Sequence, residues 1–281
     1  MPEFSAADVA ALRKQTGAGM MDCKQALEES GGDLEAAKSW LRERNLAGST
    51  KRAGREASEG AVDVVVEGDA GAIVEVNCET DFVAKGAQFT AFVTELARHV
   101  MEHGDEDVES QAFAGSSVGE AISQLAGTLG EKLALGRVVR YQTSSGLLDG
   151  YRHVQNERGV IGVLVELEGV GRSDPTAARV AHDLALHIAS AAPRYVSREE
   201  VPDDVVAKER DVFEALTRNE GKPEQAIPKI VEGRLNGFFK EVVLLEQGFV
   251  REPKTSVRTL VEELGPDATV RRFARVKIGE D

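Results

Sequence analysis

Apolar residues recur at helical spacing three times within residues 1–46, and a capping or turn signal precedes each run. Ser5 starts the first helix, in a capping-box pattern with Asp8. The glycine-rich turn at 16–19 leads into a second short helix, and Asp33 caps a third one. This pattern predicts a compact three-helix unit.

The next residues, 47–57, lack an apolar stripe and mix small residues with bases. The bases in and just before this segment are Arg42, Arg44, Lys51, Arg52 and Arg55. We expect a basic linker that tethers the helical unit to the rest of the chain, with a contact to nucleic acid as the alternative.

The pattern then changes to that of β-structure. Turn residues at 68–71 separate two strand-like segments within 61–77, which predicts a β-hairpin. A helical stripe follows, made of Phe89, Phe92, Val93, Leu96 and Val100. Further helices are predicted near 107–113 and 116–128, and a strand near 132–143.

The remaining chain repeats this order of elements. It predicts strands at 147–154 and 159–168, a helix at 174–191, and later strands near 239–246 and 269–278. Residues 203–238 carry two helical segments joined by a turn. Val205 and Val212 are seven residues apart, as are Val206 and Phe213, which favours a coiled-coil-like seam within a projecting antiparallel hairpin.

These elements together predict an α+β fold. A three-helix unit at 1–46 and the linker precede a core of two similar halves, 58–145 and 146–281. Each half is expected to hold an antiparallel sheet with helices, and the helical hairpin at 203–238 is inserted in the second half.

Charge is distributed unevenly over the 281 residues, whose formal net charge is −14. Residues 59–145 contain 15 acids and only 5 bases. An acidic surface repels phosphate backbones, so we expect no direct contact between this half and nucleic acid. The charge suits a basic protein partner, or serves solubility alone.

Nothing in the sequence predicts a membrane protein or a secreted one. No apolar run approaches the roughly 20 residues that span a bilayer, and the N-terminus lacks the features of a signal peptide. The two cysteines, Cys23 and Cys78, form no C-x-x-C pair. We therefore expect a cytoplasmic protein.

Catalytic motifs are scarce. His99, Glu102 and His103 form an H-x-x-E-H pattern that could hold a metal ion, but no third ligand is evident. The alternative is a solvated polar end of a helix. Because neither a phosphate-binding loop nor a G-x-S-x-G motif is present, we expect a binding protein that is not an enzyme and needs no cofactor.

The segment 80–85 is the best candidate for a binding site. Thr80 stands between a predicted strand and a predicted helix, where it can cap the helix, and Asp81 lies in the first turn. Phe82 has two interpretations. It could extend the core stripe, since it lies seven residues before Phe89, or it could be an exposed aromatic probe for another protein.

Two motifs resemble those of the elongation factor Ts family, which exchanges nucleotide on the GTPase elongation factor Tu. One is Thr80-Asp81-Phe82-Val83, and the other runs from Thr16 through Lys24 to Leu27. The likeness continues through 161–165 and 231–234 and covers nearly all of the chain. The resemblance implies that residues 1–46 adopt a ubiquitin-associated-like fold.

The resemblance also implies which residues bind the GTPase. Thr80, Asp81, Phe82 and Val83 would form a tip that disturbs its Mg²⁺ and phosphate site. Further contacts would come from Arg13, Met20, Met21 and His153. A ubiquitin-associated-like adaptor without exchange activity is the alternative function. The sequence leaves open whether the helical hairpin drives homodimerisation, contacts the GTPase or does neither.

Overall fold

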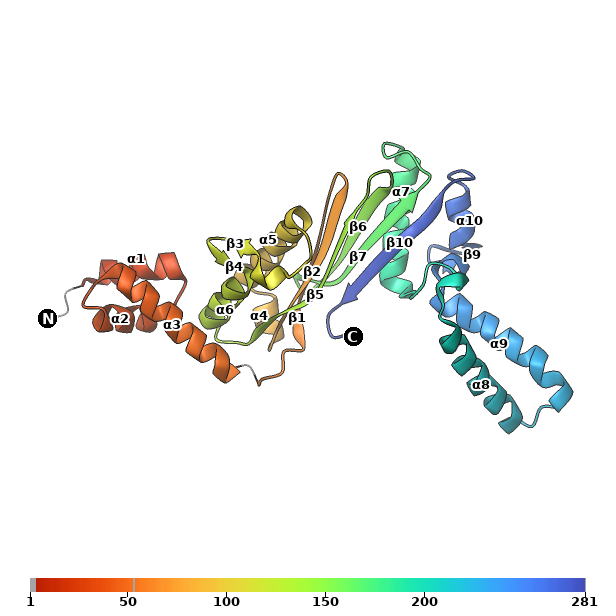
Figure 1. Cartoon of the computed structure of the whole chain (residues 1–281), viewed down its shortest axis with the longest axis horizontal. Helices are drawn as coiled ribbons and strands as arrows, with labels where there is room; N and C mark the ends of the chain where they lie inside the picture. Colours follow the sequence, from red (N-terminus) through yellow and green to blue (C-terminus); the bar gives the residue numbers. More distant parts are fainter. Residues whose placement is uncertain (1–3, 53, 281) are drawn as a thin grey trace.

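The computed structural model of the chain describes residues 4–52 and 54–280 and shows an elongated molecule (Figure 1). Three helices form one end, two three-stranded β-sheets with their helices form the middle, and a helical hairpin projects from the other end. Position 53 and the side chains of 47–52, which belong to the predicted linker, lie outside the description. The α+β fold class is confirmed.

The N-terminal unit holds the three predicted helices. They are α1 (Ala6–Thr16), α2 (Met20–Glu29) and α3 (Leu34–Arg52). Ser5 and Asp8 form the predicted capping box, and Leu12, Cys23 and Leu27 pack in a small apolar core. Helix α3 passes residue 46, so the predicted linker begins inside a helix. Gly48 costs a helix only about 1 kcal/mol relative to alanine, too little to end it.

The first half of the core is a three-stranded antiparallel sheet of order β1-β2-β5 with helices on one face. Its larger elements are β1 (Glu59–Glu67), β2 (Ala70–Cys78), α5 (Ala87–His103), α6 (Val118–Leu129) and β5 (Leu133–Gln142). Side chains of α5, α6 and the sheet share one apolar core, in which Phe89 is fully buried.

The predicted helix at 107–113 is wrong. This stretch holds a single 3₁₀ turn, η1 (Val108–Ser110), and a small hairpin of β3 (Ala112–Phe113) and β4 (Ser116–Ser117). Asp107, Ala114 and Gly115 all have positive φ, which a right-handed helix does not allow.

The second half is built in the same way, with a sheet of order β10-β7-β6 and helices on its outer face. Its larger elements are β6 (Leu147–Gln155), β7 (Arg158–Glu168), α7 (Pro175–Ala191), α10 (Val257–Glu262) and β10 (Thr269–Lys277). Shorter elements precede the last two: η2 (Arg198–Glu200), η4 (Leu244–Glu246), β8 (Gly248–Phe249) and β9 (Glu252–Ser256).

The strand predicted near 239–246 is also wrong. Helix α9 (Ile227–Val242) continues to Val242, and η4 follows it. Val243 and Leu244 are fully buried among neighbouring elements, so the apolar run there reflects burial on all sides rather than one face of a strand.

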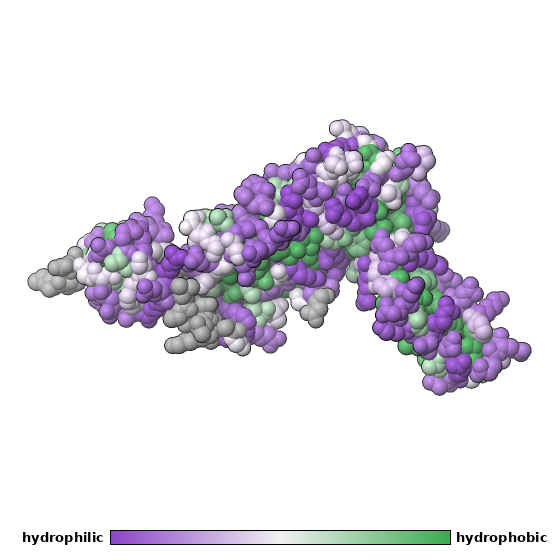
Figure 2. Space-filling model, viewed as in Figure 1, coloured by the Kyte–Doolittle hydropathy of each residue, from purple (hydrophilic) through white to green (hydrophobic). Residues whose placement is uncertain are grey.

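The two sheets pack face to face between the helical layers. Val62 and Ile73 of the first sheet meet Leu164 and Val276 of the second. Gly162 in β7 permits this close approach, because a Cβ at this position would lie 2.6 Å from Cγ1 of Val62. Figure 2 shows hydrophobic residues where the sheets meet and between the hairpin helices.

The helical hairpin consists of α8 (Asp203–Asn219), a 3₁₀ turn η3 (Glu224–Ala226) and α9. Val206 and Phe213 pack against Val231 and its neighbours on α9, as the seven-residue spacing predicts. The other predicted pair does not form the seam, because Val212 is 57% exposed. None of the helices in the described residues is long and apolar enough to span a membrane.

Candidate functional site

The tip, residues Thr80 to Val83, begins where β2 ends. Thr80 has an extended backbone, and its Oγ1 accepts a hydrogen bond from the backbone N–H of Val83 at 3.3 Å. This is the predicted N-cap. The helix it starts, α4 (Asp81–Ala84), is a single turn. Gly86 then has an extended backbone and serves as the N-cap of α5, so α4 and α5 are separate helices.

This break decides between the two interpretations of Phe82. Its side chain is 82% exposed, the highest fraction among the large hydrophobic side chains of the described residues. Val83 and Ala84, which follow it, face inward and pack in the core of the first half. The core-stripe interpretation is therefore wrong. Phe82 is held away from the core by its own buried neighbours.

Asp81 lies beside Phe82 and forms an ion pair with Lys85, one turn further along the chain. The hydrogen bond and charge of the Lys85 ammonium lower the pKa of the Asp81 carboxyl below its ordinary value. The tip thus presents an ionised carboxylate and an exposed aromatic ring side by side. Because Lys85 is itself partly exposed and the ring of Phe82 faces solvent, both groups remain accessible to a partner.

Sequence reasoning missed a neighbour of the tip. Glu131, in the connection between α6 and β5, accepts hydrogen bonds from the backbone N–H and the hydroxyl of Thr80, at 3.0 and 2.5 Å. The two residues are 51 positions apart, and no local motif connects them. Only the pairing of β2 with β5 brings them together.

Cys78, at the base of the tip, is not a reactive thiol. It is fully buried, its Sγ lies 3.2 Å from the carbonyl oxygen of Thr80, and burial raises its pKa to about 12. Burial also raises the pKa of Cys23. Since the thiolate is the nucleophile, neither cysteine is suited to covalent catalysis.

In the N-terminal unit, Arg13, Met20 and Met21 flank the turn at 17–19, and all three are exposed. The exposed fractions of the two methionines are 49% and 72%. The small core of this unit is filled by Cys23 and Leu27 instead. Paired exposed methionines form an adaptable apolar contact surface.

His153 lies near the end of β6, in the second half. It is exposed, and its Nδ1 lies 3.1 Å from the hydroxyl of Tyr151. The predicted binding residues thus fall on three parts of the molecule: the N-terminal unit, the tip and the second sheet.

The H-x-x-E-H pattern has a structural explanation. His99 is buried, its Nε2 lies 2.9 Å from Oε1 of Gln111, and its ring stacks on that of His103. Burial and the neighbouring His103 lower the pKa of His99. Within the described residues, no three histidine, cysteine or acidic side chains are grouped so as to hold a metal ion.

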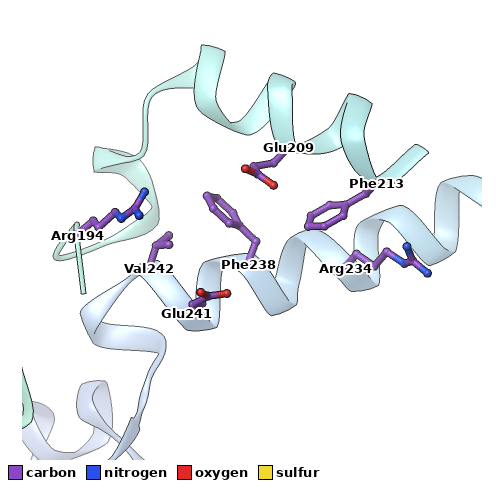
Figure 3. Close-up of a pocket in the computed structure, with 7 residues that line it drawn as sticks. All are labelled: Arg194, Glu209, Phe213, Arg234, Phe238, Glu241 and Val242. Atoms are coloured by element: carbon purple, nitrogen blue, oxygen red, sulfur yellow. The ribbon is translucent and has the colours of Figure 1, made fainter. Parts of the chain in front are cut away.

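A groove with a volume of about 500 Å³ lies at the base of the helical hairpin. Figure 3 shows the residues that line it. It is lined by Arg194, Glu209, Phe213, Arg234, Phe238, Glu241 and Val242. Two phenylalanine rings lie between the helices, and charged side chains surround them. The lining holds no histidine, cysteine or hydroxyl group, and the groups in it that could act as a general base are the carboxylates of Glu209 and Glu241.

Comparisons with known proteins agree on one family. The family model described as elongation factor TS matches residues 79–280, which include the tip, the first half from the end of β2 onward and nearly all of the second half. The chain is 46% identical over 287 residues to elongation factor Ts of Thermobifida fusca (strain YX), with all of both chains covered. It is 48% identical to elongation factor Ts of Nocardioides sp. (strain ATCC BAA-499 / JS614) and 42% identical to that of Micrococcus luteus, with 99% of this chain and all of each relative covered.

Proposed function

Because the chain belongs to the elongation factor Ts family, we propose that it binds elongation factor Tu and promotes the exchange of GDP for GTP during translation elongation. The observation that carries this proposal is Phe82, which is 82% exposed on a capped single turn beside the ionised Asp81. The protein would work in the cytoplasm, by binding alone, without making or breaking a covalent bond.

The energetic demand on such a factor is moderate. When a GTPase binds GDP with nanomolar affinity, the binding free energy is about 12 kcal/mol. Accelerating release by about 10⁴ requires about 5.5 kcal/mol of preferential binding to the loosened state. A few well-placed contacts can supply this amount.

Phe82 supports the proposal as a wedge. Burying a phenylalanine side chain stabilises a complex by about 1.5–3 kcal/mol, and aromatic residues at the centre of an interface often contribute more. The ring is exposed in the free protein, so this stabilisation arises only when a partner buries it. Inserted beside the nucleotide site, Phe82 would favour a loosened conformation of the GTPase.

Asp81 would act on the Mg²⁺ that bridges the GTPase and the phosphates of its nucleotide. Its carboxylate is already ionised, so no proton must be lost on binding. Its partner in the free protein is the partly exposed Lys85. On binding, the carboxylate would exchange this partner for groups around the ion, which would weaken the hold of Mg²⁺ on the nucleotide.

The other exposed residues would hold the GTPase while the tip acts. Met20 and Met21 in the N-terminal unit and His153 in the second half would provide contacts on either side of the tip. With the partner held at separate points, insertion of the tip becomes nearly intramolecular. Linkage requires the factor to bind the nucleotide-free GTPase most tightly and incoming GTP to expel it.

The test is the release of a fluorescent GDP analogue from elongation factor Tu, followed in excess unlabelled nucleotide with increasing amounts of this protein. We expect the release rate to rise to a plateau. No acceleration by the folded protein with its cognate GTPase would overturn the proposal. Binding without acceleration, carried by residues 1–46, would favour the adaptor function instead.

A further inference from the structure

Helix α4 cannot hold its own position. It has four residues, and a single helical turn is unstable in water because nucleation costs more than its hydrogen bonds return. Its orientation must therefore come from contacts with the rest of the fold. The buried side chains of Val83 and Ala84 anchor its inner face, but they leave the first residues of the turn unsupported.

Glu131 supplies the missing support from the neighbouring strand connection. Its Oε2 accepts hydrogen bonds from the backbone N–H groups of Glu79 and Thr80, at 3.1 and 3.0 Å. Its Oε1 accepts from the hydroxyl of Thr80 at 2.5 Å. One carboxylate thus binds three donors on the two residues that lead into α4. Hydrogen bonds to an ionised acceptor are about twice as strong as neutral ones.

The arrangement is reciprocal. The carboxylate of Glu79 accepts from the backbone N–H of Lys132 at 2.6 Å, and from Arg55 at 3.2 Å. The pairing of β2 with β5 ends at Cys78 and Leu133. Beyond that pair, backbone hydrogen bonds between the strands stop. The connection after β2 and the connection before β5 are held together instead by two glutamate side chains, each of which accepts a hydrogen bond from the backbone of the other connection.

The path of the chain explains why Glu131 reaches the tip. Helix α6 ends at Leu129, and its C-cap Gly130 adopts the left-handed conformation with φ 78° and donates its N–H to the carbonyl of Ala126. This turn directs the next residue back toward the end of β2. No side chain of α4 itself provides an equivalent support for Thr80.

We propose that Glu131 is the positioning residue of the tip, holding Thr80 and thereby the direction in which Phe82 and Asp81 project. The inference rests on the proposed exchange function. Glu131 acts through Thr80, so its loss misdirects the tip while the other contacts with the GTPase persist. The maximal rate of nucleotide release should therefore fall more than the affinity.

The first test uses the free protein and needs no partner. Glu131→Gln keeps the shape of the side chain but replaces one accepting oxygen with an amide NH₂, so some of its three donors lose their acceptor. We expect backbone amide hydrogen exchange at Glu79 and Thr80 to become at least about tenfold faster, with the amides of α5 unchanged. Unchanged exchange at both residues would overturn the proposal.

Glu200→Gln is the matched control. The Glu200 carboxylate also accepts a hydrogen bond from a backbone N–H, that of Val196 at 2.9 Å, but it lies in the second half. Its substitution should leave amide exchange at the tip unchanged. Should Glu131→Gln fail to fold, Glu131→Asp keeps the charge, and its shorter side chain loses the same contacts.

The second test is a double-mutant cycle in the GDP-release assay. Glu131→Gln should lower the maximal release rate about tenfold and change the half-saturating concentration less than about twofold. In the Phe82→Ala background the same substitution should have a clearly smaller effect, because of the two side chains that Glu131 directs only Asp81 remains. Equal effects in both backgrounds, or a change in half-saturation alone, would overturn the positioning role.

The two tests separate the inference from the proposed function. A wild-type protein that does not accelerate release overturns the exchange function, and the role of Glu131 in it falls as well. A wild-type protein that accelerates release, with Glu131→Gln equally active, overturns the inference alone.

Discussion

Phe82→Ala and Phe89→Ala make the same chemical change seven residues apart, with opposite expected results. Phe82 is 82% exposed and Phe89 is fully buried. Truncating an exposed side chain changes the free energy of unfolding by less than about 0.5 kcal/mol, whereas Phe→Ala in a core costs about 3–5 kcal/mol. We therefore expect Phe82→Ala to lose exchange activity but keep its stability, and Phe89→Ala to lose stability.

The size of the activity loss follows from burial. If Phe82 is buried in the complex, its truncation removes about 1.5–3 kcal/mol of binding to the loosened state. Each 1.36 kcal/mol is a tenfold change in rate, so the rate of GDP release at a given factor concentration should fall by about 10- to 150-fold.

Urea unfolding measures the stability of both variants, and release of a fluorescent GDP analogue from elongation factor Tu measures their activity. Release by Phe82→Ala at the wild-type rate would refute the wedge. A loss of stability in Phe82→Ala close to that in Phe89→Ala would show that the ring is buried, and would refute the structural argument as well.

Three further predictions concern other parts of the chain. Asp81→Ala should slow GDP release less than Phe82→Ala does, and the difference from wild type should shrink when Mg²⁺ is chelated; an equal loss without Mg²⁺ would contradict the role of the carboxylate. Gly162→Ala should lower the free energy of unfolding by about 1–3 kcal/mol in urea titrations, because the added Cβ would lie 2.6 Å from Val62 of the facing sheet. His187 is 1% exposed, burial lowers its pKa, and its Nδ1 accepts a hydrogen bond from the N–H of Val250 at 3.1 Å. Since the unfolded chain then binds the proton more readily, stability should be fully present above the ordinary histidine pKa of about 6.5 and should fall as the pH drops below it. Urea titrations at several pH values check this, and His187→Gln should show a weaker dependence; equal pH dependence in both proteins would contradict it.

Local chemistry predicted the elements that begin with a clear cap. The capping box of Ser5 and the N-cap of Thr80 both form, because each needs only side-chain and backbone groups within one turn. Alternation likewise predicted the β-hairpin around 68–71. These features depend on neighbours in sequence, so a sequence contains what is needed to predict them.

Prediction failed where periodicity fitted more than one structure. The run near 239–246 contains four consecutive buried apolar residues, Val242 to Leu245, a pattern that fits a buried strand as well as the end of a helix, and the structure ends α9 there. The spacing of Val205 and Val212 matched a seam as well as that of Val206 and Phe213 did, yet α9 packs against the second pair. Which stripe of a helix is buried depends on where its partner lies.

The sequence by itself determined the family, the order of most elements and the chemical character of the tip, since motifs, caps and alternation are local properties. Only the tertiary structure decided that Phe82 is exposed. Spacing relative to Phe89 fitted burial as well as exposure, and the break at Gly86 with the inward anchoring of Val83 decided for exposure. The contact of Glu131 with Thr80 also required the fold, because strand pairing alone brings together residues 51 positions apart.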